Sequence, residues 1–80
     1  MDKITKALEK LERRERDKVE LAIARILLRQ LAEYDVKKVQ GLKNLYRIRI
    51  GRHRIIFFMT KERVIVVDVT KRDENTYKNL

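Results

Sequence analysis

The hydrophobic positions in the first part of the chain follow a helical spacing. In Asp2–Leu11 they recur at i, i+3, i+4 and i+7, which is the pattern of one helix face. They are Ile4, Ala7, Leu8 and Leu11. A charged stretch, Glu12–Arg16, then separates them from the next apolar run. We therefore predict a short amphipathic helix over Asp2–Leu11.

A second, longer helix is predicted from Asp17 to about Tyr34. One face carries a regular apolar stripe, made of Val19, Ala22, Ile23, Ile26 and Leu27. Further apolar residues lie elsewhere around the helix, namely Leu21, Ala24, Leu28 and Leu31. Because this apolar arc is wider than contact with one sheet requires, we expect the second helix to touch both the first helix and the sheet. The two helices would form a hairpin.

From Leu45 onward the pattern becomes extended, with many β-branched and aromatic residues. Three strands are predicted, at Leu45–Ile50, His53–Met59 and Arg63–Val69. Gly51 and Arg52 have the length of a two-residue hairpin loop, in which glycine supplies a positive φ. Thr60–Glu62 is also a short connection, so the strands should form a meander. The predicted fold class is α+β: an N-terminal helical hairpin packed on a small antiparallel sheet.

The hairpin loop fixes which residues of the first two strands lie opposite each other. The predicted pairs are Ile50 with His53, Arg49 with Arg54, Ile48 with Ile55, Arg47 with Ile56, and Tyr46 with Phe57. Since side chains alternate across a strand, one face is apolar and should be covered by the helices. The other face carries Arg47, Arg49 and Arg54 beside Ile56.

This arginine face suggests a binding site for phosphate. Like charges directly opposite each other destabilise a sheet unless an anion neutralises them. Guanidinium groups stay protonated and can hold phosphate oxygens in a bidentate fork. The alternative is that Arg47, Arg49 and Arg54 form only a solvated surface, as most exposed charges do.

The overall charge supports a polyanionic partner. The 80 residues include 21 Lys and Arg against 12 Asp and Glu, for a net charge of +9. The excess is greatest over Asn44–Arg72, where eight basic residues face two acidic ones. Such a field attracts polyanions and accelerates their encounter. Nucleic acid is therefore the first candidate partner.

The composition also excludes several kinds of chemistry. The chain has no cysteine, which excludes disulfides and thiolate metal sites and suits a reducing cytosol. It has no serine nucleophile, no Gly-rich phosphate loop and no set of metal ligands around its single histidine. We expect no metal and no cofactor. No apolar run approaches the roughly 18 residues of a membrane span, so we expect a cytoplasmic protein that does not bind membranes.

Three residues outside the arginine face are further candidates. In a meander, the end of the third strand lies beside the hairpin loop, which would bring Arg72 towards Arg49 and Arg54. Tyr77 could transfer a proton or stack on a base, or it could simply pack back on the sheet. His53 is the only side chain with an ordinary pKa near neutrality, yet the predicted pairing places it on the apolar face, where a structural role is favoured.

The stretch Val39–Phe57 resembles the RelE/ParE toxin superfamily. There a leucine–glycine turn precedes the run Tyr-Arg-x-Arg-x-Gly-x-Tyr-Arg, which is matched here by Gly41-Leu42 and then by Tyr46-Arg47-Ile48-Arg49-Ile50-Gly51-Arg52-His53-Arg54. The pair Lys71-Arg72 followed by Tyr77 is similar to the basic-then-tyrosine ending of these toxins. The chain departs in three ways. It lacks the usual strand before the first helix, it has His53 where a tyrosine is usual, and it has arginines where lysines can donate protons.

The resemblance implies one RelE-like toxin domain over residues 1–80. Its activity would be a ribosome-dependent endoribonuclease that cuts mRNA by attack of the 2′-hydroxyl on the adjacent phosphate, and a cognate antitoxin would hold it inactive. In these terms Arg54 and Arg72 would stabilise the phosphate charge, Arg47 or Arg49 would favour the 2′-oxyanion or assist the leaving group, and Tyr77 would orient the base or transfer a proton. Further RNA contacts are expected from Lys43, Arg52, His53 and Lys71.

Two other functions are compatible with the same fold. One is a ParE-like toxin that inhibits DNA gyrase and cuts nothing, and the other is a non-catalytic RNA-binding module. An uncovered sheet edge would favour a homodimer or a toxin–antitoxin hetero-oligomer.

Overall fold

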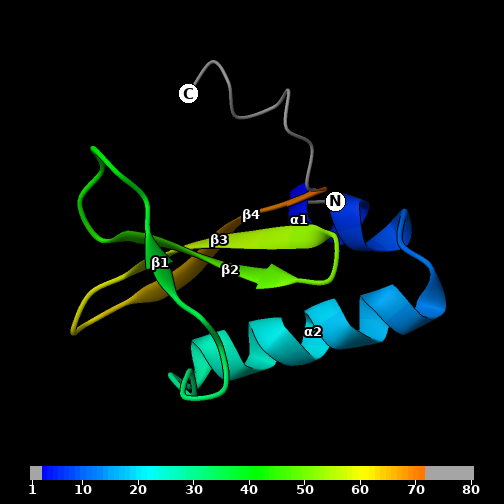
Figure 1. The fold of residues 1–80 in the computed structure, drawn as a ribbon, viewed down its shortest axis with the longest axis horizontal. Helices are drawn as coiled ribbons and strands as arrows, with labels where there is room; N and C mark the ends of the chain where they lie inside the picture. Colours follow the sequence, from blue (N-terminus) through cyan, green and yellow to red (C-terminus); the bar gives the residue numbers. More distant parts are fainter. Residues whose placement is uncertain (1–2, 72–80) are drawn as a thin grey trace.

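The computed structural model describes residues 3–71 and contains two helices and a four-stranded sheet (Figure 1). The elements are α1 (Lys3–Glu9), α2 (Arg13–Leu27), β1 (Lys37–Lys38), β2 (Leu45–Ile50), β3 (His53–Met59) and β4 (Val64–Lys71). The strands lie in the order β1-β2-β3-β4 and every neighbouring pair is antiparallel. Helix α2 contacts β2, β3 and β4, while α1 contacts β4 and α2. The predicted α+β meander is confirmed, with one more strand than expected.

Helix α2 begins and ends earlier than its apolar stripe predicted. Glu12, in an extended conformation, is the N-cap residue, and its backbone carbonyl oxygen accepts a hydrogen bond from the amide of Arg16 at 2.8 Å. The charged residues from Arg13 onward are good helix formers and join the first turn. At the other end, Arg29 has a φ of 60°. Its amide donates a hydrogen bond to the backbone carbonyl oxygen of Ile26, and the amide of Gln30 donates one to the backbone carbonyl oxygen of Arg25 at 2.8 Å. This Schellman arrangement stops the helix at Leu27, and not at Tyr34 as predicted.

The segment after α2 folds back along the helix through Arg25. The Arg25 guanidinium donates to the carboxylate of Glu33 and lies 5.9 Å from the centre of the Tyr34 ring. The hydrogen bond to Glu33, aided by the attraction between the two charges, raises the pKa of Arg25 above its usual value. Leu31 and Tyr34 are partly buried against the core. These contacts hold the segment between α2 and β1 against the rest of the protein.

The predicted hairpin register is confirmed at every pair. Ile50 lies opposite His53, Arg49 opposite Arg54, and the remaining pairs follow to Leu45 and Phe58. Gly51 adopts a φ of 58° in the connecting turn, as the loop length required. Strand β4 begins one residue later and ends two residues later than predicted. A bulge at Ile56/Phe57 shifts its register against β3.

The core lies between α2 and one face of the sheet. Its buried residues are Val19, Ala22, Ile26, Ile48, Ile55, Phe57 and Val69. The Tyr46 and Phe57 rings stack with their centres 5.8 Å apart. Leu27, which was predicted on the packed stripe, is 53% exposed, whereas Ile26 before it is fully buried, so the stripe that packs is narrower than predicted and runs through Val19, Ala22 and Ile26. Neither helix of residues 3–71 has the length and apolar character of a membrane span.

Candidate nucleic-acid interface

The face of the sheet opposite the core is organised in three rows of side chains, and we call it the open face. Residues paired across antiparallel strands point to the same side, so the register defines each row. The row nearest the β2–β3 turn is Arg49, Arg54 and Thr70; the middle row is Lys37, Arg47, Ile56 and Asp68; the third is Leu45, Phe58 and Ile65. The open face is therefore basic at one end and apolar at the other.

Four cations gather at the basic end, and we call Lys37, Arg47, Arg49 and Arg54 the basic cluster. Lys37 lies directly opposite Arg47, and Arg49 directly opposite Arg54. All four line one groove on the open face together with Asp35 and Ile48. The Asp35 carboxylate lies 3.6 Å from the Lys37 ammonium group. The lining of the groove therefore has four positive charges and one negative charge, a net charge that suits an anion.

The chemistry that suits this groove is the binding of a phosphate diester. Arg49 is exposed, and Arg47 and Arg54 are half-buried, so their guanidinium groups are held by the sheet and still reach solvent. Arginine forks match phosphate oxygens in a bidentate manner. A pre-positioned cluster of such groups also stabilises negative charge that develops on phosphorus during a transfer reaction. Binding a phosphate would in addition relieve the repulsion between the paired cations.

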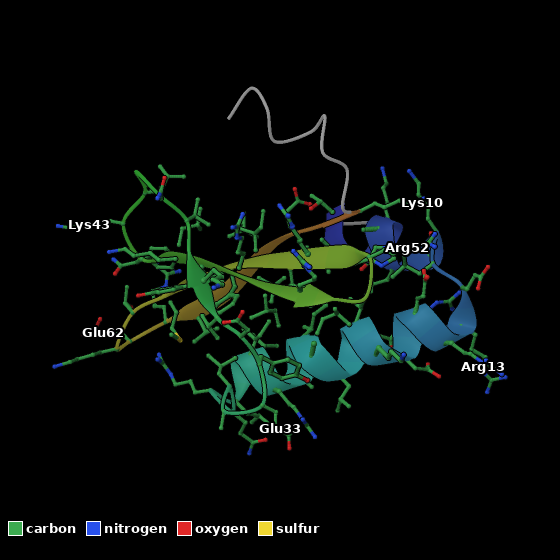
Figure 2. The ribbon with its side chains drawn as sticks, viewed as in Figure 1. Lys10, Arg13, Glu33, Lys43, Arg52 and Glu62 are labelled. Carbon is green, nitrogen blue, oxygen red and sulfur yellow. The ribbon has the colours of Figure 1, made fainter. Side chains whose placement is uncertain are left out.

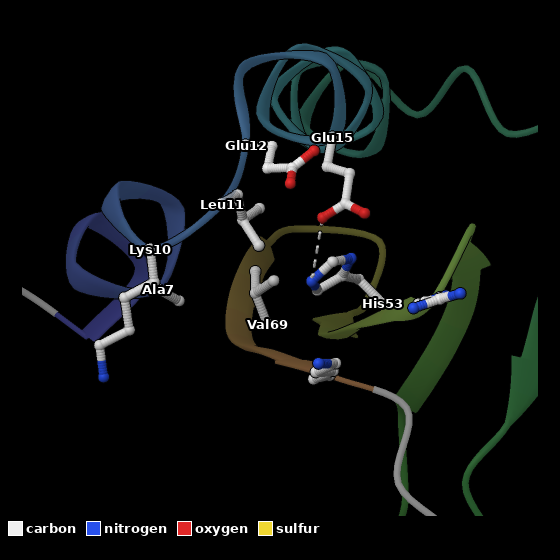
Figure 3. Close-up of a pocket in the computed structure, with 9 residues that line it drawn as sticks. Ala7, Lys10, Leu11, Glu12, Glu15, His53 and Val69 are labelled. Atoms are coloured by element: carbon white, nitrogen blue, oxygen red, sulfur yellow. Dashed lines mark ion pairs between the residues drawn. The ribbon is translucent and has the colours of Figure 1, made fainter.

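His53 points away from the basic cluster. It lies on the helix-facing side of β3, where it is 6% exposed, and its Nε2 lies 3.9 Å from a Glu15 carboxylate oxygen on α2 (Figure 3). The structural role favoured for His53 from the pairing agrees with this position. The RNA contact also predicted for His53 is not supported by it, because the strand alternation turns the imidazole towards the helices.

Arg52 and Lys71 lie near His53 at the turn end of the hairpin. Both are exposed and line the pocket between α1, α2 and the β2–β3 turn. Lys71 is the partner of His53 across β3 and β4, so it starts on the helix-facing side and not on the open face. Their predicted RNA contacts would have to be made around the end of the sheet.

Lys43 is separated from the other predicted contacts. It belongs to the β1–β2 connection, and Figure 2 shows it at the end of the molecule opposite Arg52. Arg72 and Tyr77 lie outside the described residues. The end of β4 does reach the basic cluster as the meander predicted, since Thr70 lies opposite Arg54.

Lys37 is the member of the basic cluster that the sequence reasoning missed. It belongs to a strand of two residues, too short to show an alternating pattern. The connection between β1 and β2 nevertheless carries a sequence signal for a turn, since Gly41 and Asn44 both adopt a positive φ, of 80° and 60°. Gly and Asn are the residues that tolerate this conformation, and a tight return before β2 implies a strand beside it.

Metal ligands do not gather anywhere in the part of the chain that the structure describes. No group of three or more His, Cys, Asp or Glu side chains is placed to hold an ion among residues 3–71.

The family model described as the ParE toxin of the type II toxin–antitoxin system parDE matches residues 1–76. This chain is a toxin of the RelE/ParE superfamily. The inferred toxin RelE1 of Methanocaldococcus jannaschii is 33% identical over 48 residues, which cover 59% of the chain and 53% of the relative. The match thus spans about half the length of that relative.

Solved structures share the fold of this toxin. The RelB–RelE antitoxin–toxin complex from Methanococcus jannaschii contains a chain with a TM-score of 0.78 and 24% identity, and the match covers 100% of this toxin and 95% of that chain. The archaeal RelE–RelB complex from Pyrococcus horikoshii gives a TM-score of 0.69 and 21% identity, with coverage of 92% and 91%. Two N-terminal helices packed on a four-stranded antiparallel sheet are therefore a RelE-like fold.

Proposed function

We propose that this toxin is an endoribonuclease that cuts mRNA on the ribosome. The observation that carries the proposal is the basic cluster, in which Arg49 faces Arg54 and Lys37 faces Arg47 on the sheet face that the helices leave open. A mechanism that uses the substrate's own 2′-hydroxyl needs groups that bind and neutralise the phosphate, and this cluster has that chemistry.

The cleavage step follows from the chemistry of RNA. The 2′-oxygen attacks the adjacent phosphorus, the bond to the 5′-oxygen of the next nucleotide breaks, and a 2′,3′-cyclic phosphate and a 5′-hydroxyl result. The 2′-hydroxyl loses a proton and the leaving oxygen gains one. We assign the charge stabilisation to Arg54, with Arg47 and Arg49 beside it. Arg72 keeps its predicted role in stabilising the phosphate charge. Proton transfer is assigned to Tyr77, because arginine is a poor proton donor.

A protein antitoxin is the proposed regulatory partner. The solved structures that share this fold are complexes of a RelE toxin with a RelB antitoxin. A net charge of +9 favours an acidic partner. We expect a toxin–antitoxin hetero-oligomer in which the antitoxin prevents RNA from reaching the basic cluster.

A translating extract tests the nuclease directly. Wild-type toxin should leave new 5′ ends within codons of a reporter mRNA, and Arg54→Ala should leave the mRNA intact. Arg13→Ala is the matched control, since it removes the same charge from an exposed position at the start of α2, away from the open face (Figure 2). Intact mRNA with folded wild-type toxin would reject the proposal.

The second candidate function is inhibition of DNA gyrase without RNA cleavage. The observation that favours it is the family match, because the matching model is the ParE toxin of parDE. A supercoiling assay with purified gyrase separates the two candidates. Inhibition of supercoiling together with intact mRNA in the translating extract would select the ParE-like function.

A further inference from the structure

A second groove adjoins the basic cluster on its apolar side. Its apolar walls come from the β1–β2 connection and from the open face, and they are Val39, Leu42, Leu45 and Ile56. Two members of the basic cluster, Lys37 and Arg47, line both this groove and the phosphate groove described above. The two grooves are therefore continuous, with a shared wall of positive charge between them.

We infer that this second groove binds an unpaired nucleobase of the RNA whose phosphate occupies the basic cluster. The inference rests on the proposed RNA binding and identifies a base-binding site for it. A base is flat, uncharged and apolar on its two faces, whereas a phosphate is anionic. The chain presents these two environments side by side, so one nucleotide unit can place its phosphate at Arg47 and Lys37 and its base against Leu42 and Leu45.

The spacing of the rows agrees with this placement. Leu45 and Arg47 lie on the same face of β2, two residues apart, which is about 6.6 Å along a strand. That distance is the scale on which base and phosphate alternate along single-stranded RNA. Proteins that bind single strands commonly combine a positive track with surfaces on which bases stack.

Lys38 adds a further cation to the lining, and one uncharged polar side chain lines the groove as well. Gln40 lies in the β1–β2 connection and carries an amide with both a donor and an acceptor. Against a base edge it can form two hydrogen bonds, as Asn and Gln do with adenine. The groove would then discriminate between bases as well as hold one.

The alternative occupant is an apolar side chain of a protein partner. The cationic wall favours the nucleotide, because Asp35 pairs with Lys37 alone and an apolar anchor would bring no negative charge to this net-positive wall. Leu42 is 54% exposed, so its side chain can be removed with little loss of packing. Leu27 on α2 is 53% exposed and lies on another element, which makes it a matched control.

The test uses ribosomes programmed with an mRNA whose vacant A-site codon carries 2′-deoxy sugars, so that it binds without being cut. The base is removed at one codon position at a time, and the Kd of N-terminally labelled toxin is measured. For wild type and Leu27→Ala, removal at one position should raise Kd by about tenfold, given the usual strength of base stacking. Leu42→Ala should bind the intact codon about tenfold more weakly and should no longer respond to removal of that base.

Two outcomes would overturn the inference. One is an equal response of Leu42→Ala and wild type to base removal at every position. The other is RNA binding by Leu42→Ala that equals wild type while its affinity for a copurifying antitoxin falls, which would assign the groove to the protein partner. Cleavage of unmodified mRNA, measured in parallel, keeps the two proposals apart: a base-removal effect without cleavage would reject the nuclease and leave the base-binding groove standing.

Discussion

At the scale of single residues, the arginine pair Arg49 and Arg54 places two permanent charges on directly opposed positions of neighbouring strands. Such a pair destabilises a sheet by a few tenths of a kcal/mol to about 1 kcal/mol in the absence of a counterion. Asp68, in the next row of the same face, offsets part of this cost in the free protein, and a bound anion would relieve the remainder. This arrangement is expected of a binding surface and not of one shaped by stability alone.

We predict that Arg49→Gln stabilises the free protein by roughly 0.5 kcal/mol at low ionic strength, because it removes this repulsion and keeps most of the side chain. The free energy of unfolding should be measured in urea, which adds no charge. The gain should shrink in 1 M sodium chloride, where the Debye length falls to about 3 Å. Lower stability of Arg49→Gln at low salt would show that the pair is not repulsive.

A second residue-scale prediction concerns the neighbours Phe57 and Phe58, which point to opposite faces of β3. Phe57 is fully buried and stacks on Tyr46, whereas Phe58 lies half-buried on the open face. Phe57→Ala should therefore cost about 3 to 5 kcal/mol of unfolding free energy, and Phe58→Ala clearly less. Thermal and urea unfolding measure both, with Phe57→Leu as a milder substitution in case Phe57→Ala does not fold. Equal losses at the two positions would contradict the assignment of faces.

At the scale of elements, Arg29 joins helix α2 to the β3–β4 turn. Its backbone closes the helix in a left-handed conformation, and its guanidinium donates to the carbonyl oxygens of Thr60 and Lys61. A residue with a Cβ pays about 1 kcal/mol or more for that conformation. The side-chain contacts across two elements offset this cost.

Substitutions at Arg29 separate these two contributions. Arg29→Ala should destabilise the protein because it loses the contacts with the turn and keeps the strained backbone. Arg29→Gly also loses the contacts but relieves the strain, so it should be about 1 kcal/mol more stable than Arg29→Ala. Urea unfolding of both variants measures the difference. Equal stability of the two would mean that position 29 is not left-handed in solution.

The elements also show how far the sequence determines the structure. The register of β2 and β3 was predictable because Gly51 and Arg52 fix the turn and one face is continuously apolar. The end of α2 was not predictable, because Arg29 occupies the left-handed position at which a glycine usually marks the end of a helix. Strand β1, with two residues, is set by pairing with β2 and not by its own pattern. The alternation of the longer strands therefore predicted Arg47, Arg49 and Arg54, whereas β1 has no alternation of its own that would have predicted Lys37.

At the scale of the whole molecule, the net charge of +9 and the excess of basic residues over Asn44–Arg72 would make the proposed association with RNA largely electrostatic. Each cation that neutralises a phosphate releases counterions, so the logarithm of the binding constant falls linearly with the logarithm of the salt concentration. Lys37→Gln should reduce this slope by about 0.7 to 1. Titrations of programmed ribosomes at several salt concentrations measure it, and Lys18→Gln, at an exposed position on α2, is the control. An unchanged slope for Lys37→Gln would remove Lys37 from the interface.

Cleavage of RNA at the open face of the sheet by way of the RNA's own 2′-hydroxyl can be measured by single-turnover kinetics on programmed ribosomes. Wild-type toxin should cut an all-ribose A-site codon to a 2′,3′-cyclic phosphate and a 5′-hydroxyl. A single 2′-deoxy sugar at the cut position should abolish the reaction, and Arg54→Ala should slow it by at least about a hundredfold, as the loss of a group that stabilises the transition state does. Cleavage of the 2′-deoxy codon would rule out attack by the 2′-hydroxyl, and an unchanged rate for Arg54→Ala would rule out the open face as the site of cleavage.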